Sequence, residues 1–144
     1  MYLTAASAGI IAGAIILFLA HIAPRFGAGN FIRDIDEPRI FGRELTRRES
    51  HLIGVLTHLT VSGVFGCAFA ILIQLGIFQG FDVIPILIWS AVLFVFMGGV
   101  IIPLEGHGIF GIKEDAWFPF DLLMSNILWG VLFWMTMRLW IVAN

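Results

Sequence analysis

The sequence predicts an all-α, polytopic membrane protein, folded as a single four-helix transmembrane domain over residues 1–144. Hydrophobic residues make up 60% of the chain and charged residues only 12%, and the mean hydropathy is +0.99. A soluble globule of this length needs far more polar side chains to cover its surface. Four long apolar runs and an uneven distribution of cations complete the prediction, because they indicate where and in which direction the chain crosses a bilayer.

The four runs are each long enough to cross about 30 Å of hydrocarbon at about 1.5 Å per residue. They are expected to be helices, because a spanning segment has to satisfy its own backbone hydrogen bonds and these runs are too long for barrel strands. The expected spans cover about residues 3–23, 51–77, 83–102 and 120–142, and Pro103 ends the third.

The cations orient these spans. Of the eight Lys and Arg residues, six lie in the connection 24–50, and Lys113 lies in the connection 103–119. The positive-inside rule then predicts that both connections are cytoplasmic. Both termini are expected outside, where Arg138 is the single cation. No basic group precedes the first span, which suits an uncleaved anchor better than a removable signal peptide.

The connection 24–50 is expected to be an interfacial segment on the cytoplasmic surface. It mixes apolar side chains such as Phe26, Phe31 and Ile40 with arginines and acids. Apolar groups spaced among charges suit a segment at the level of the lipid headgroups. Its acids offset its arginines, so it is not a nucleic-acid-binding arm. The lipid bilayer is therefore its expected partner, in preference to a soluble protein.

Small residues recur at helical spacing in the first two spans. Helices in lipid associate through close packing at such residues. In the second span the row has a four-residue period, which keeps it close to one helix face, and His58 stands within it. The residues expected to pack helices together, within the chain or between chains, are Gly9, Gly13, Gly54, Ser62, Gly66 and Ala70.

Three polar residues are expected inside the cytoplasmic half of the bundle: His58, Ser125 and Asn126. Polar groups at this depth are costly unless they meet partners or water. A hydrogen bond between helices is the favoured role for His58 and Asn126. Most other polar residues near the same surface, Asp121 among them, are expected to be hydrated or to complement helix ends.

The alternative interpretation of the polar residues near the cytoplasmic surface is that they bind a metal, a haem or a proton. The residues His51, His58, Glu105 and His107 are of types that suit zinc or iron, although their spacings match no compact metal motif. Haem ligation by His58 lacks a second deep histidine on a facing helix. A proton path through Glu105, His107 and Asp121 is the third possibility.

No catalytic residue is assigned, because no phosphate loop, nucleophile elbow or pair of carboxylates is found. The sequence requires no cofactor, and a non-enzymatic protein is favoured. Trp89 and Trp129 are deep enough to line a groove for a lipid, quinone or pigment tail, but packing inside the bundle is favoured for both. The single Cys67 excludes an intramolecular disulfide.

Short glycine-based motifs are distributed over most of the chain: "AGIIAG", "HLTVSGVFG", "PLEGHGIFG" and "NILWG". In this order they resemble a group of small four-helix bacterial integral membrane proteins of unknown function. The resemblance implies a compact four-helix fold and a prokaryotic cytoplasmic membrane, and it supplies no activity. Members of that group often carry a histidine where this chain has Asn126, a departure that argues against haem or metal at this position.

The favoured function is therefore an accessory or scaffolding subunit that packs against other membrane subunits or forms a homo-oligomer. A metal-, haem- or proton-binding membrane protein is the alternative. An oligomeric transporter or channel is a further alternative, and it has less support because few polar residues beyond Gln74 and Ser90 continue into the outer half.

Overall fold

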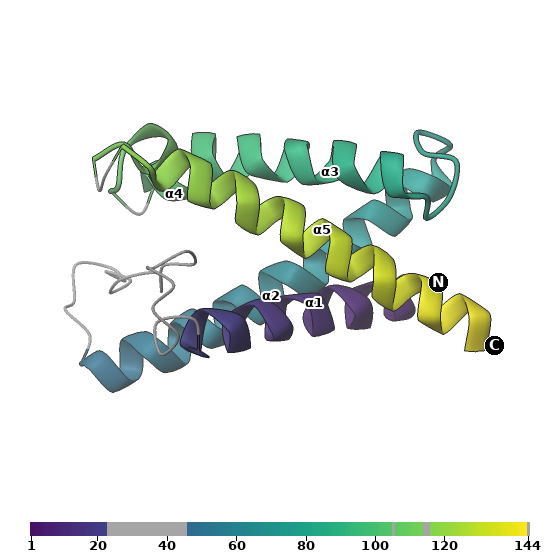
Figure 1. The fold of residues 1–144 in the computed structure, drawn as a ribbon, viewed down its shortest axis with the longest axis horizontal. Helices are drawn as coiled ribbons and strands as arrows, with labels where there is room; N and C mark the ends of the chain where they lie inside the picture. Colours follow the sequence, from purple (N-terminus) through teal and green to yellow (C-terminus); the bar gives the residue numbers. More distant parts are fainter. Residues whose placement is uncertain (23–45, 105, 114–115, 144) are drawn as a thin grey trace.

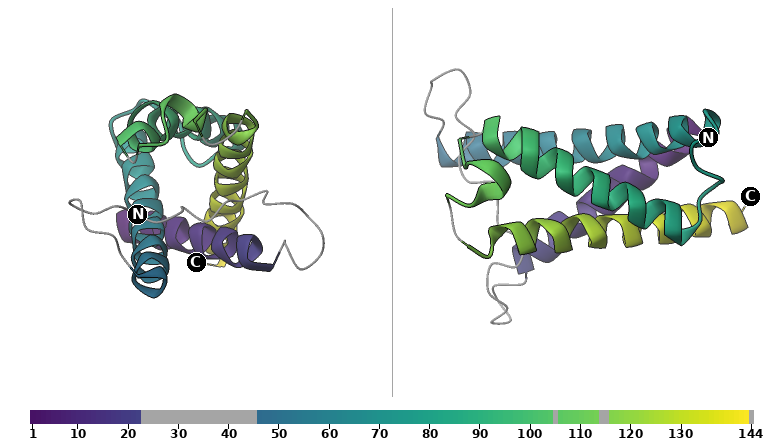
Figure 2. Two further views of the ribbon diagram at one scale, coloured as in Figure 1. Left: turned by 90° about the vertical axis from the view of Figure 1, so that its left-hand side faces the viewer. Right: turned by 90° about the horizontal axis from the view of Figure 1, so that it is seen from above.

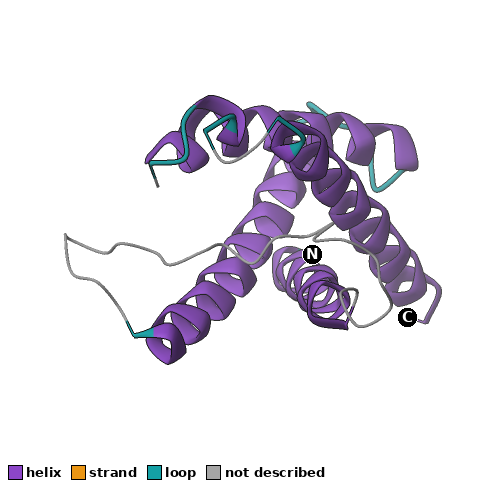
Figure 3. Cartoon of the chain, turned by 60° about the vertical axis from the view of Figure 1, so that its left-hand side comes forward, coloured by secondary structure: helices purple, strands orange, loops and turns teal. Residues whose placement is uncertain are grey.

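The computed structural model describes residues 1–22, 46–104, 106–113 and 116–143, and these form helices and short connections without a strand (Figure 3). Four helices are long and apolar enough to cross a membrane: Tyr2–Ile22, His51–Gln74, Val83–Leu104 and Phe118–Trp140. The predicted all-α fold is confirmed, and so is the prediction of four helices of sufficient length and apolar composition to cross a membrane. Most of the predicted interfacial segment, residues 24–45, lies outside the described residues.

The helix α1 (Tyr2–Ile22) closely matches the first predicted span, and α2 (Arg47–Gln74) begins four residues earlier than expected. A capping box explains the early start. Thr46 Oγ1 accepts from the backbone N–H of Glu49 at 3.4 Å, and Glu49 Oε2 accepts from the backbone N–H of Thr46 at 3.0 Å. These two bonds satisfy amide groups that have no partner within the helix.

The C-terminus of α2 lies three residues before the predicted one. Gly76 has a positive φ of 74°, and two backbone bonds close the end: Gly76 N–H donates to Ile73 O at 3.0 Å, and Ile77 N–H donates to Leu72 O at 3.0 Å. This is the Schellman pattern, which favours glycine at its left-handed position. Gly76 therefore ends the helix although apolar residues continue beyond it.

The third span has three parts: α3 (Val83–Phe96), the π-helical turn η2 (Met97–Ile101) and the short α4 (Ile102–Leu104). Pro103 has no N–H, and in a regular α-helix its ring would crowd the carbonyl four residues earlier. The turn before it is widened, so that Ile102 N–H bonds to Met97 O, five residues back. The span therefore passes Pro103 and continues to Leu104. It is followed by the turn η3 (Ile109–Gly111) and the last helix, α5 (Phe118–Ala143).

The four spans form two crossed helix pairs. α1 packs against α2 and α5, and α3 packs against α5. Both termini lie at the same end as the turn between α2 and α3 (Figure 1), which we call the terminal end. Viewed along the bundle, the pairs cross so that the four helices occupy the four sides of a square (Figure 2).

The core includes an aromatic cluster toward the terminal end. Phe69 of α2 and Phe133 of α5 are fully buried, with ring centroids 5.8 Å apart. Trp129 stacks on Phe133 at 5.0 Å, and Trp89 of α3 lies 6.2 Å from Phe69. Side chains from three helices thus meet around Phe69, which joins the two pairs.

Candidate functional site

The α1–α2 interface is built on glycines that bring two backbones into contact. A methyl group on Gly9 would collide with the carbonyl oxygen of Ser62, and one on Gly66 would collide with the carbonyl oxygen of Ala5. Gly13 faces the Ser62 side chain, whose Cβ is 2.9 Å from the position that a Cβ on Gly13 would take. Backbones that approach this closely gain van der Waals contact that larger side chains would prevent.

On α2, the row of residues spaced four apart has one part that contacts other helices and one part that is open. The row consists of Gly54, His58, Ser62, Gly66 and Ala70. Ser62, Gly66 and Ala70 are buried. At Gly54, by contrast, no atom of the described residues, beyond its own helix backbone and chain neighbours, lies within 4 Å of the position of an added Cβ. Most of the row is therefore used inside the chain, and one glycine near the start of α2 faces outward.

His58 lies between these two parts, half-buried against α1. Its Cδ2 is 3.5 Å from the position that a Cβ on Gly13 would take, which is an ordinary contact distance, so the imidazole ring lies beside Gly13 of α1. The Nε2 atom of His58 is buried and has no hydrogen-bond partner in the part of the chain that the structure describes. A buried polar atom without a partner loses its hydration and gains nothing in return.

Ser125 and Asn126 of α5 form hydrogen bonds within their own helix. Ser125 Oγ donates to the carbonyl oxygen of Asp121 at 2.8 Å. Asn126 Nδ2 donates to the carbonyl oxygen of Leu122 at 2.8 Å. Among the described residues, His58 Nε2 forms no hydrogen bond to another helix, and the Asn126 amide group donates instead to a backbone carbonyl one turn earlier in its own helix.

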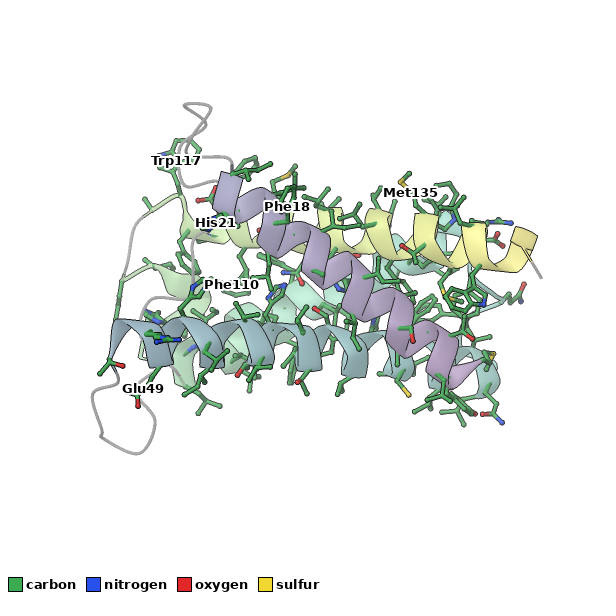
Figure 4. All side chains as sticks on the ribbon, turned by 90° about the horizontal axis from the view of Figure 1, so that it is seen from below. Phe18, His21, Glu49, Phe110, Trp117 and Met135 are labelled. Atoms are coloured by element: carbon green, nitrogen blue, oxygen red, sulfur yellow. The ribbon has the colours of Figure 1, made fainter. Side chains whose placement is uncertain are left out.

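The other histidines lie near the surface at the opposite end from the termini. His21 and His51 are exposed and His107 is half-buried. Figure 4 shows His21, Glu49, Phe110 and Trp117 at this end, which we call the loop end. Among the described residues, no three His, Cys, Asp or Glu side chains are grouped closely enough to hold a metal ion. Glu105 lies outside the described residues, so the predicted metal set with His51, His58 and His107 stays a prediction.

The connection between α4 and α5 is folded rather than extended. Gly106, Gly108 and Gly111 have φ of 94°, 77° and 72°. Backbone bonds join His107 N–H to Ile102 O at 3.2 Å and Lys113 N–H to His107 O at 3.2 Å. The glycines of this segment therefore permit tight left-handed turns, which other residues adopt only with strain.

Phe110 closes this connection onto the bundle. Its ring lies directly on Gly98, in the π-helical turn, where an added Cβ would collide with it, and it lies 4.9 Å from the ring of Phe94. Phe110 is the only non-glycine residue with positive φ in the part of the chain described, at 53°. That conformation costs a bulky residue about 1–3 kcal/mol, which the contacts of the ring have to offset.

Trp89 and Trp129 belong to the aromatic core, as their ring contacts show. Their indole Nε1 atoms are buried without hydrogen-bond partners, as is that of Trp134. Indole N–H groups can interact weakly with aromatic faces such as those of Phe69 and Phe133. These donors therefore do not by themselves mark a ligand.

Two features of the site were not anticipated from the sequence. Arg138 Nη2 donates to Asp82 Oδ1 at 2.7 Å, which ties α5 to the start of α3 at the terminal end. The sequence contained a signal for this ion pair. Arg138 is the only cation and Asp82 the only acid expected on the outer side, and they lie on adjoining elements. The left-handed Phe110 gave no signal, because nothing in "GIFG" distinguishes which residue takes the positive φ.

Fold and site together define an α-helical protein with four helices able to cross a membrane, two crossed pairs, and a folded connection at the loop end. Comparison with models of known protein families, with curated proteins and with solved structures gave no match.

Proposed function

We propose that this protein is a non-enzymatic integral membrane protein, an accessory or scaffolding subunit that packs against other transmembrane helices or against a second copy of itself. The observation that carries the proposal is the open part of α2. Gly54 meets nothing within 4 Å, and Leu52 and Leu56 beside it are exposed. A glycine flanked by large apolar side chains is typical of surfaces where membrane helices approach each other.

The same observation supports an external partner rather than a further contact inside the chain. Gly66 and Ser62, on the same row, already contact α1, so this part of the row is not available to a partner. We place the protein in a prokaryotic cytoplasmic membrane with both termini outside, because the cations of the connections 24–50 and 103–119 favour that orientation.

The test compares assembly of the parent with that of Gly54→Leu in lipid nanodiscs. The parent is expected to form a species larger than the 16.0 kDa chain, either with itself or with a membrane protein crosslinked before extraction. Gly54→Leu should lose most of that species because its side chain separates the helices. Gly99→Leu is the matched control, since Gly99 is an equally open glycine in the third span.

A monomeric parent that yields no crosslinked partner would refute the proposal. So would an assembly that Gly54→Leu and Gly99→Leu weaken equally, because the open part of α2 would then have no special role.

A second candidate function rests on the unpartnered Nε2 of His58. In a protein that binds a metal, a haem or a proton at the loop end, this imidazole nitrogen would bind that group. A visible spectrum and elemental analysis of protein purified from native membranes test this. A Soret band, or near-stoichiometric iron, zinc or copper that is lost in His58→Leu, would favour it over the accessory role.

His58→Leu also separates the two candidates by stability. If Nε2 has no partner, replacing the imidazole with an apolar side chain of similar size should leave the free energy of unfolding unchanged or raise it by about 1–2 kcal/mol. If a bound group occupies the site, the variant loses the stabilisation that binding supplies. A clear drop in stability would therefore count for the binding function.

A further inference from the structure

Leu104, at the end of the third span, and the connection that follows it to α5 expose large apolar side chains. The exposed fractions are 79% for Leu104, 65% for Ile109, 63% for Ile112 and 72% for Trp117. In water this concentration on one short segment would be unfavourable. The backbone does not hide these groups, so they need an apolar neighbour outside the chain.

The length of the neighbouring spans sets the depth of this segment. Val83–Leu104 has 22 residues, and at about 1.5 Å per residue it is about 33 Å long, against about 30 Å of hydrocarbon. Leu104 therefore lies close to the hydrocarbon boundary, and so does Phe118, where the last span begins. By this reckoning the described residues between them, 106–113 and 116–117, lie at the level of the headgroups.

The contacts of Phe110 determine which side of the connection between α4 and α5 faces away from the bundle. Its ring is seated on Gly98 and next to Phe94, while Gly111 lies under the ring of Phe118. The contact side of the turn is thus filled by Phe110 and Gly111. Ile109 and Ile112, on either side of them in the sequence, remain outside that contact.

We propose that this segment inserts into the membrane surface, with Leu104, Ile109, Ile112 and Trp117 among the upper acyl chains and the exposed Lys113 at the lipid phosphates. The apolar surface is continuous with the lipid-facing surface of the spans, because Val100 before it and Phe120 after it are exposed too. Tryptophan is enriched at this depth, and a lysine ammonium pairs with phosphate. The partner is therefore the lipid leaflet, and this inference does not depend on the proposed accessory role.

Spin labels at Ile109→Cys and Ile112→Cys in the full chain, reconstituted into liposomes, test the insertion by their collision rates with oxygen and with a water-soluble nickel complex. The background is Cys67→Ala. A second set retains Cys67, with the parent chain as the labelling blank, in case Cys67→Ala fails to fold. Gln79→Cys, in the exposed turn between α2 and α3, is the water reference, and Ile88→Cys, on the exposed side of α3, is the lipid reference.

Insertion predicts that labels at Ile109 and Ile112 collide with nickel several-fold less than the Gln79 label, and with oxygen nearly as often as the Ile88 label. Lys113→Glu should move the Ile112 label toward the Gln79 values, because it removes the attraction to phosphate. Nickel collision equal to that of Gln79 would overturn the proposal. Labels shielded from both oxygen and nickel would also overturn it, because a protein would then cover the segment.

Discussion

Substitution of two glycines of one helix by alanine offers the sharpest test of how α1 and α2 pack. Gly66→Ala and Gly54→Ala are the same chemical change on α2, at positions twelve residues apart. At Gly66 the new methyl group meets the carbonyl oxygen of Ala5 and, at 3.3 Å, the ring of Phe133. At Gly54 it meets nothing within 4 Å.

The expected effects have opposite signs. Alanine in place of a helical glycine gains about 0.5–1 kcal/mol through lower backbone entropy in the unfolded chain. An extra methylene forced into a packed interface costs about 1–3 kcal/mol. Because the obstacle at Gly66 is the backbone of α1, relief requires the whole helix to move, and we expect a net loss of about 1–2 kcal/mol. Gly54→Ala should be neutral or more stable by up to about 1 kcal/mol.

Reversible unfolding in mixed micelles of dodecyl maltoside and dodecyl sulfate measures both variants against the parent. A difference of about 2 kcal/mol between them corresponds to roughly a thirtyfold difference in the unfolding equilibrium constant. Equal free energies of unfolding for the two variants would refute the reasoning, because the α1–α2 interface would then not depend on a bare glycine at position 66.

Three further changes test other parts of the fold. Arg138→Gln should cost less than about 1 kcal/mol, since its ion pair with Asp82 is largely exposed. In high salt, the difference in stability between the parent and Arg138→Gln should disappear. A difference that does not depend on salt would contradict the electrostatic explanation. Thr46→Ala should cost about 1 kcal/mol and speed amide exchange in the first turn of α2; unchanged exchange there would mean that the cap is not formed. Gly111→Ala should cost about 2–4 kcal/mol, because it combines positive φ with a ring contact. Gly76→Ala has a similar φ but open space around it, so it should cost only about 1 kcal/mol, and equal losses would exclude the contact as a cause.

The spans could be predicted from composition and length, because a bilayer imposes both. Their ends could not be read from hydropathy, since local chemistry decides them. The "TRRE" capping box at residues 46–49 starts α2 before the apolar run does, and Gly76 stops it while the run continues. The π-helical turn lets the third span continue past Pro103, where a simple proline rule ends it.

The packing residues show a different limit of prediction from sequence. Four-residue spacing identifies a face of α2 suited to close approach, but spacing does not reveal which helix occupies it. In the structure α1 takes the part around Ser62 and Gly66, and the part around Gly54 is open. The roles of polar side chains were harder still to predict. The Asn126 amide donates to a carbonyl oxygen one turn away on its own helix, and only the coordinates show that it takes this acceptor.

Phe110 and His58 both depart from what local rules favour, and they differ in whether the structure compensates. The left-handed backbone of Phe110 is offset by a ring seated against Gly98 and Phe94, so the strain has a structural explanation. The imidazole of His58 lies beside Gly13, and its buried Nε2 has no hydrogen-bond partner among the described residues. Departures without compensation are expected at functional positions. Binding chemistry at the loop end, if the protein has any, should therefore involve His58 before the exposed His21 and His51.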